Sequence, residues 1–293
     1  MTTTVTSRFD DLHENPLIAA SDLPFGAPRF DRIRDEHYLP AIEAGMRMHI
    51  DEVAFIADSS EAPTFENTVV ALERSGLALT RVLKVFGTVV SSNINDTLQD
   101  VQREVAPKLA AHGDAIYLND ALYQRVGTLF ERRDSLGLSS EGLHLLERYH
   151  LEFVRAGAAL SEEGKERLRA LNQEEASLTT DFQARLLAAT KAGALVIDDP
   201  ADLDGLTEDG IAAAAEAATE RNLPGKWLLR LANTTQQPAL ESLRRRDVRQ
   251  RLFEASICRT ERGDENDTRQ IVLRLAALRA ERAALLGYDT VAA

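Results

Sequence analysis

The chain has 293 residues, 44% of them hydrophobic and 28% charged, and its 34 Lys+Arg against 47 Asp+Glu give a formal net charge of −13. A surface this acidic would repel a polyanion, so the composition excludes a protein whose main function is to bind nucleic acid. The single cysteine, Cys258, excludes an intramolecular disulfide framework and any multi-cysteine zinc or iron–sulfur site.

Residues 1–30 are predicted to form an extended N-terminal lead-in, because Pro16, Pro24 and Pro28 interrupt regular structure. Met1–Asn15 contains acidic residues and no apolar run, unlike a signal or transit peptide. No stretch of the chain approaches the ~18 consecutive apolar residues of a membrane span. We therefore expect a cytoplasmic protein that does not associate with membranes.

Residues 31–192 are predicted to form an N-terminal helical region. The first helix begins near Asp35, and its apolar residues share one face: Leu39, Ile42, Met46, Val53 and Ile56. After a break, Thr64 is a plausible N-cap for a helix in which apolar residues and Gly76 recur every three or four positions as far as Val90. This spacing is typical of long antiparallel helix pairs.

Further helices are expected in the same region. Asn95 or Asp96 can cap the next one, which Pro107 should kink or divide. Two more are predicted over about 120–134 and 140–156, and the longest helix is predicted to begin after Ser161.

Residues 193–293 are predicted to form a second helical region with a small β element. Ala194–Ile197 and Trp227–Leu231 are short apolar runs bounded by turn formers, which favours two strands. Thr207 can cap a helix between them. The fold class is therefore mainly α, with long antiparallel helices and at most a small β element near residues 194–232.

The chain is expected to return to helix after Pro238. Asp247 and Asp267 are candidate caps, and the helical pattern persists to Gly287. The chain stops soon after a glycine that is typical of a helix end followed by more chain. We therefore expect it to be truncated.

No active site is evident from the residues alone. The zinc-peptidase motif His-Glu-x-x-His is absent, because the only His-Glu pair is His13-Glu14 and position 17 is Leu. The inverted motif, His-x-x-Glu-His, is also incomplete: His144 and Glu147 match it, but the fifth residue is Arg148.

Glu147 and His150 form one Glu-x-x-His, of which a di-iron centre needs two copies. His144 and His150 are also separated by about 120° around a helix. A structural or surface role is therefore favoured for His144, Glu147 and His150, with a metal site as the alternative.

Two other features of the sequence are functional candidates. Cys258 is favoured as a buried core thiol over a catalytic nucleophile, because no histidine lies near it in the sequence. One basic cluster is favoured as a solvated helix face, with an anion-binding or partner-binding surface as the alternative. Its members are Arg244, Arg245, Arg246, Arg249 and Arg251.

Several segments together resemble the thimet oligopeptidase family of zinc metallopeptidases, and within it the bacterial peptidyl-dipeptidase and oligopeptidase A branch. These segments follow one another in the order found in the family. They are Phe30–Ile33, Glu36–Ile42, Pro63–Thr68, Ala71–Glu73, Glu104–Leu109, Leu146–Tyr149, Phe153–Gly157, Leu171–Glu174, Leu278–Arg282 and Leu285–Tyr288. One small departure is Asp35, where the family often has Pro.

The resemblance implies an almost wholly helical, two-sided peptidase fold with a deep channel that admits short peptides. It also implies zinc in the full-length enzyme, bound by a His-Glu-x-x-His helix and a further Glu. All of that machinery would lie C-terminal to the segments matched here. We therefore assign no catalytic and no metal residue in this chain, expect it to bind no zinc, and leave the substrate-binding residues unknown.

The resulting hypothesis is the N-terminal segment of a zinc-dependent oligopeptidase or peptidyl-dipeptidase. This segment would form part of the channel wall and would be inactive without the C-terminal catalytic half, its expected partner. Apolar surface intended for that half is expected to be exposed. The alternatives are a non-catalytic helical protein that binds peptides or a partner, and a metal enzyme built around His144, Glu147 and His150.

Overall fold

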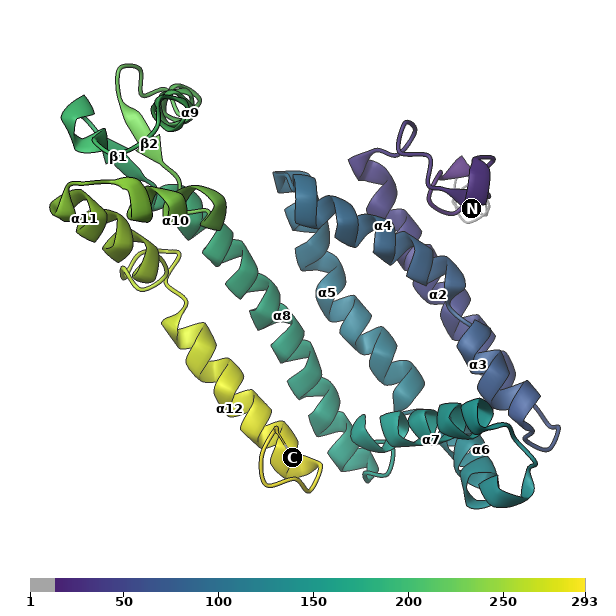
Figure 1. The fold of residues 1–293 in the computed structure, drawn as a ribbon. Helices are drawn as coiled ribbons and strands as arrows, with labels where there is room; N and C mark the ends of the chain where they lie inside the picture. The colour runs from purple at the N-terminus through teal and green to yellow at the C-terminus, as the bar shows by residue number, and fades with distance from the viewer. Residues whose placement is uncertain (1–13, 293) are drawn as a thin grey trace, which may run out of the picture. The chain divides into compact units, whose positions relative to one another are not determined.

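The computed structural model describes residues 14–292 and is mainly α-helical, as predicted (Figure 1). Residues 1–13, including His13 and the first part of the predicted lead-in, lie outside the described residues. The α-helices are α2 (Tyr38–Ala57), α3 (Ala71–Arg74), α4 (Leu77–Asn93), α5 (Asp96–Tyr117), α6 (Asp120–Glu131), α7 (Ser140–Arg155), α8 (Glu162–Ala192), α9 (Glu208–Thr219), α10 (Asn233–Ser242), α11 (Arg246–Ile257) and α12 (Arg269–Leu285). A π-helical segment, Phe65–Val70, leads into α3.

The chain divides into two compact units. Among the described residues, the first comprises 14–177 and 278–292, and the second comprises 178–277. This division describes contacts in space, and the boundaries drawn from the sequence stay predictions. No helix among the described residues combines the length and the apolar character needed to cross a bilayer.

The core of the first unit consists of two apolar clusters. One joins α2, α4 and α5, where Tyr38 and Phe86 pack with ring centroids 5.2 Å apart and Val82 is fully buried. The other joins the end of α2 to α6 and α7 through the fully buried Leu122 and Phe153. Burying large side chains of this kind contributes about 1.5–3 kcal/mol each. Helix pairing in this unit therefore follows the apolar stripes seen in the sequence.

The predicted helix from Thr64 to Val90 is wrong in one respect, because the structure interrupts it at Gly76. This residue has φ +67°, in the left-handed region that favours glycine, and it begins α4 as its N-cap. Its N–H donates to Glu52 Oε2 at 2.7 Å. A side chain on α2 therefore fixes the break, which the three- and four-residue spacing could not reveal.

A chain of hydrogen bonds runs beside this break. Ser75 Oγ donates to the carbonyl of Leu72 at 2.7 Å, and His49 Nε2 lies 3.1 Å from the same Oγ. Because the hydroxyl proton is already used, His49 Nε2 is the donor and its Nδ1 accepts from His112 Nε2 at 3.0 Å. Burial and the neighbouring His49 lower the pKa of His112 to about 4. The two histidines therefore link α2 to α5 as neutral rings.

The predicted N-caps in the first unit are confirmed. Thr64 Oγ1 accepts from the N–H of Asn67 at 3.1 Å, and Asn67 Oδ1 accepts from the N–H of Thr64 at 2.8 Å. Asn95, rather than Asp96, caps α5 by accepting from the N–H of Leu98. Each such cap contributes about 0.5–2 kcal/mol. Pro107 lies inside α5 without dividing it.

Arg125 on α6 ties down the loop that precedes the Thr64 cap. Its Nη1 donates to the carbonyls of Ser59 and Glu61, both at 3.0 Å, and its Nη2 donates to Asn67 Oδ1 at 3.2 Å. The residue is only 8% exposed, and its Nε is buried without a partner. A buried cation therefore holds a polar loop in place.

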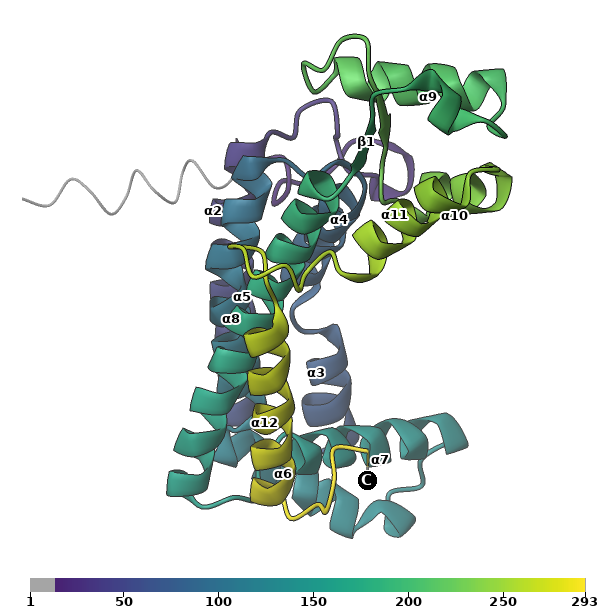
Figure 2. The same ribbon diagram turned by 90° about the vertical axis from the view of Figure 1, so that its left-hand side faces the viewer.

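The second unit contains the predicted β element. Strands β1 (Leu195–Ile197) and β2 (Trp227–Leu229) pair antiparallel, with Val196 opposite Leu228. Helices α9, α10 and α11 all contact these strands (Figures 1 and 2). Thr207 caps α9 as predicted, accepting from the N–H of Gly210. Helical packing on both strands buries Ile197 and Leu228.

Two helix starts predicted in the second unit are wrong. Helix α10 begins at Asn233 and contains Pro238, rather than following it. Asp247 lies in the first turn of α11, whose N-cap is Arg245. The Asp247 carboxylate forms an ion pair with Arg245 and does not cap the helix. Asp267 does accept the N–H of Arg269, the first residue of α12.

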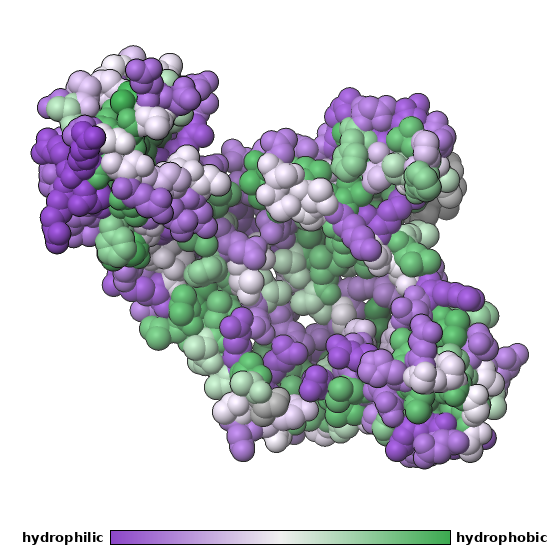
Figure 3. Space-filling view, in the orientation of Figure 1, coloured by the Kyte–Doolittle hydropathy of each residue, from purple (hydrophilic) through white to green (hydrophobic). Residues whose placement is uncertain are grey.

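Exposed apolar side chains lie on α11 and on the first half of α12. Phe253 and Ile257 are 50% and 56% exposed, and Val272 and Leu273 are 49% and 63% exposed. Figure 3 shows apolar side chains gathered along α12. Single exposed apolar residues are ordinary, whereas several on consecutive helices are a candidate surface for binding protein.

Candidate functional site

The structure gives His150 a packing role. Its ring stacks on Phe130 with centroids 3.8 Å apart and planes 3° from parallel, and the Arg133 guanidinium lies 4.5 Å from the same Phe130 ring. Burial and the charge of Arg133 lower the pKa of His150. Glu147 Oε1 lies 4.0 Å from Arg133 Nε, and His144 is exposed. A guanidinium beside Glu147 and His150 opposes binding of a metal cation there.

The described residues do not fit a catalytic zinc site. Among residues 14–292, no group of three or more His, Cys, Asp or Glu side chains is placed to hold a metal ion. The sequence also lacks His-Glu-x-x-His. We therefore assign no zinc ligand and no hydrolytic step to residues of this chain.

Cys258 is half-buried at the end of α11, whereas the sequence predicted a buried core thiol. Helix α11 ends at Ile257, so the thiol follows the helix instead of facing the core. Burial, followed by the charge of Glu261, raises the pKa of the Cys258 thiol. A nucleophilic cysteine needs a lowered pKa, so this environment does not activate it.

The basic cluster at residues 244–251 is largely neutralised. Asp202, whose side chain is 15% exposed, lies 2.5 Å from Arg245 Nη1 and 3.6 Å from Arg251 Nη1. Arg244 pairs with Asp204 at 3.3 Å. Intramolecular carboxylates therefore occupy much of the positive charge that an external anion would need.

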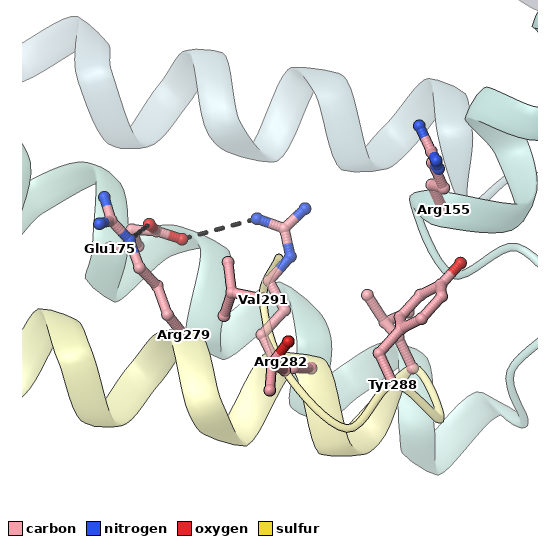
Figure 4. A pocket seen from close by; sticks show the side chains of 9 residues that line it. Arg155, Glu175, Arg279, Arg282, Tyr288 and Val291 are labelled. Carbon is pink, nitrogen blue, oxygen red and sulfur yellow. Dashed lines mark hydrogen bonds and ion pairs between the residues drawn. The ribbon is translucent and has the colours of Figure 1, made fainter. Parts of the chain in front are cut away.

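A second group of arginines, absent from the sequence-based candidates, lines a pocket in the first unit (Figure 4). The pocket has a volume of about 360 Å³, and an adjoining pocket of about 410 Å³ shares Arg155 and Arg282 with it. We call the two together the basic pocket. Its charged residues are Arg148, Arg155, Arg279, Arg282, Glu152 and Glu175. Each volume lies within the ~300–1,000 Å³ typical of small-ligand sites.

Three helices position the charges of the basic pocket. Arg155 is the last residue of α7, Glu175 lies in the middle of α8, and Arg279 and Arg282 lie one turn apart on α12. The α12 residues therefore share one helix face. Tyr288, in the segment after α12, completes the lining (Figure 4).

The glutamates balance only part of the positive charge. Arg279 Nε donates to Glu175 Oε1 at 3.0 Å, while Arg282 Nη1 lies 3.6 Å from Glu175 Oε2, too far for a good hydrogen bond. Arg148 Nε donates to Glu152 Oε1 at 2.6 Å. Among the described residues, no carboxylate forms an ion pair with Arg155. Four positive charges face two negative ones in a chain whose net charge is −13.

The sequence did contain a signal for this pocket. Arg155 lies in the segment Phe153–Gly157, and Arg279 and Arg282 lie in Leu278–Arg282, all of which contributed to the family resemblance. Tyr288 ends the last of those segments. These residues are far apart in the sequence, so no local motif indicates that they meet.

Comparison with curated proteins gives relatives over almost the whole chain, whereas no protein-family model matches it. The chain is 48% identical to the dipeptidyl carboxypeptidase of Escherichia coli (strain K12) over 279 residues, which is 95% of this chain and 41% of that protein. It is 27% identical to the probable cytosolic oligopeptidase A of Arabidopsis thaliana over 292 residues, 97% of this chain and 40% of that one. Over 282 residues it is 23% identical to oligopeptidase A of Escherichia coli (strain K12), 95% of this chain and 41% of that one.

Over almost its whole length, the chain has relatives among the dipeptidyl carboxypeptidases and the oligopeptidases A, both of which are members of the thimet oligopeptidase family. The resemblance inferred from the sequence segments is thereby confirmed. The chain spans about two fifths of the length of these relatives. Its homologues are peptidases, and identity is much higher to the dipeptidyl carboxypeptidase than to the oligopeptidases A.

Proposed function

We propose that this chain is the N-terminal segment of an oligopeptidase of the peptidyl-dipeptidase kind, which releases dipeptides from the C-termini of short peptides. The observation that carries the proposal is the 48% identity to a dipeptidyl carboxypeptidase across 95% of this chain. In the proposal, the long helices of this chain form part of the wall of the peptide channel. The chemistry belongs to the whole protein.

The proposed enzyme is zinc-dependent, and its zinc ligands lie in the length that the relatives have beyond this chain. When bound, zinc would polarise the scissile carbonyl and lower the pKa of a water molecule. The residues described here contribute no ligand, so their part is to bind and orient the peptide.

The test begins with the coding sequence beyond the Ala293 codon. We expect the reading frame to continue into a His-Glu-x-x-His helix. The complete product should then release a dipeptide from an N-blocked tetrapeptide, lose that activity in a chelator and regain it with added zinc. If the frame continues without such a motif, or if the complete product hydrolyses no peptide, the proposal fails and the non-catalytic binding protein becomes the better hypothesis.

We further propose that the remaining length of the protein packs on the exposed apolar residues of α11 and α12. Phe253, Ile257, Val272 and Leu273 support this, because they lie exposed on consecutive helices. The 293-residue chain should bind an apolar dye and the complete protein should not. Equal dye binding by both would contradict this partner. The cytoplasmic location stays a prediction, to be tested by cell fractionation.

A further inference from the structure

The basic pocket carries an excess of positive charge that structural ion pairs do not account for. Arg103 on α5, which lies outside the pocket lining, shows the usual pairing, with Asp100 at 2.7 Å. In the basic pocket, by contrast, Arg155 has no carboxylate partner among the described residues, and Arg282 reaches Glu175 only at 3.6 Å. Two guanidinium groups that line one concave surface therefore keep donors free for a ligand.

The free donors suit a carboxylate. A guanidinium presents a planar pair of N–H groups that matches the two oxygens of a carboxylate, and such charge-assisted hydrogen bonds are among the strongest in proteins. The phenol of Tyr288 is a further donor in the lining. Glu175 holds Arg279 against α8 and leaves the space next to Arg155 to the ligand (Figure 4).

The rest of the lining favours a peptide end over a small inorganic anion. Ala283, Leu286 and Val291 lie in one of the two adjoining pockets, and Leu151 and Ala156 lie in the other. An inorganic anion gains nothing from apolar side chains, whereas the terminal residues of a peptide can bury their own side chains against them. The site therefore combines a charged recognition point with room for one or two residues.

We propose that the basic pocket binds the free C-terminal carboxylate of a peptide, with Arg155 and Arg282 as its charged contacts. The proposal rests on the proposed function in one respect, because it takes peptides to be the ligands. It adds a specificity-determining site on this chain. A peptide held by its terminal carboxylate is positioned by its C-terminal end, as cleavage at a fixed distance from that end requires.

Binding to the 293-residue chain tests the proposal without any need for turnover. The probe is an N-acetylated tetraalanine peptide, titrated by calorimetry at low ionic strength with either a free or an amidated C-terminus. We expect the free acid to bind about tenfold more tightly than the amide, in line with loss of a charge-assisted contact. Arg155→Gln and Arg282→Gln should each remove most of this preference. The matched control Arg103→Gln should leave it unchanged.

Three results would overturn the assignment. The first is equal affinity for the acid and the amide. The second is an equal effect of Arg103→Gln and Arg155→Gln. The third is competition by inorganic phosphate alone that matches competition by the peptide acid, which would indicate a general anion site. Arg155 has no carboxylate partner among residues 14–292, so Arg155→Gln should keep the melting curve of the parent even if Arg282→Gln disturbs the fold.

The experiments distinguish failure of the pocket proposal from failure of the peptidase proposal. An inactive complete protein with intact acid preference would refute the peptidase function and keep the pocket. An active complete protein whose kcat/KM for free-acid and amidated substrates is unchanged by Arg155→Gln would refute the pocket and keep the peptidase.

Discussion

Replacing Gly76 by alanine should destabilise the first unit. The loss should be larger than at a glycine that has a similar φ but free space around an added Cβ. Gly76 has φ +67°, and a Cβ there would lie 2.6 Å from two ring atoms of His49. Non-bonded carbons prefer about 3.5–4.0 Å, so the imidazole would have to move by roughly 1 Å. That movement would lengthen its hydrogen bonds to Ser75 and His112, now 3.1 and 3.0 Å.

The expected loss has two parts. The left-handed conformation costs a non-glycine residue about 1–2 kcal/mol. Weakening two partly buried hydrogen bonds adds about 0.5–1.5 kcal/mol each. Gly76→Ala should therefore lower the free energy of unfolding by about 3 kcal/mol. Gly137→Ala is the matched control, because Gly137 has φ +64° but nothing within 4 Å of its added Cβ, and it should lose only the conformational part.

Urea unfolding followed by far-UV circular dichroism measures both variants against the parent. In a His49→Ala background, Gly76→Ala should cost no more than Gly137→Ala, because the ring that the Cβ meets is gone. Equal losses for Gly76→Ala and Gly137→Ala in the parent background would show that the His49 contact has no energetic weight, and the reasoning would be refuted.

Three further predictions concern other parts of the fold. The lowered pKa of His112, about 4 against 6.5, means that the unfolded chain takes up its proton first; stability is therefore lost as the pH falls from about 6.5 to about 4. The full pKa shift corresponds to roughly 3 kcal/mol of stability, which solvent screening should reduce to about 1–2 kcal/mol. Urea unfolding at pH 7 and at pH 4.5 should therefore show that His112→Gln loses less stability between the two pH values than the parent does. An identical pH dependence of the two proteins would contradict this. Arg125→Met should lower the free energy of unfolding by about 3 kcal/mol, because three acceptors lose a buried charged donor. A loss below about 1 kcal/mol in the same urea assay would show that Arg125 does not hold this loop in place. In Gly205→Ala the added Cβ would lie 2.0 Å from a carbonyl oxygen, whereas in Gly225→Ala it would have nothing within 4 Å. The second unit of Gly205→Ala should therefore unfold at a clearly lower urea concentration than that of Gly225→Ala. Trp227 fluorescence measures both unfolding curves, and coincident curves would contradict the prediction.

Local signals predicted much of the fold. Thr64, Asn95 and Thr207 are predicted as caps because each is a short polar residue before a run of periodic apolar residues, and the structure places all three as N-caps. Both strands were found from short apolar runs between turn formers. In each case the deciding interactions lie within a few residues along the chain.

The features that the sequence did not reveal depend on side chains from elsewhere in the chain. The break at Gly76 relies on Glu52 and His49 of another helix, and apolar spacing continues across it. Similarly, Arg155 and Arg282 belong to helices remote in sequence, so neither has a local pattern that indicates a pocket. The family resemblance selected both segments, but only the folded chain shows that they meet.

The single cysteine can serve as a chemical probe for opening of the second unit. Because the thiolate is the reacting species, the raised pKa and partial burial of Cys258 should make a maleimide dye attach slowly to the folded protein. Once the second unit opens, the same thiol should react at the rate of a free cysteine. The ratio of these rates measures how often the second unit opens, and no thiol in the first unit contributes to the signal.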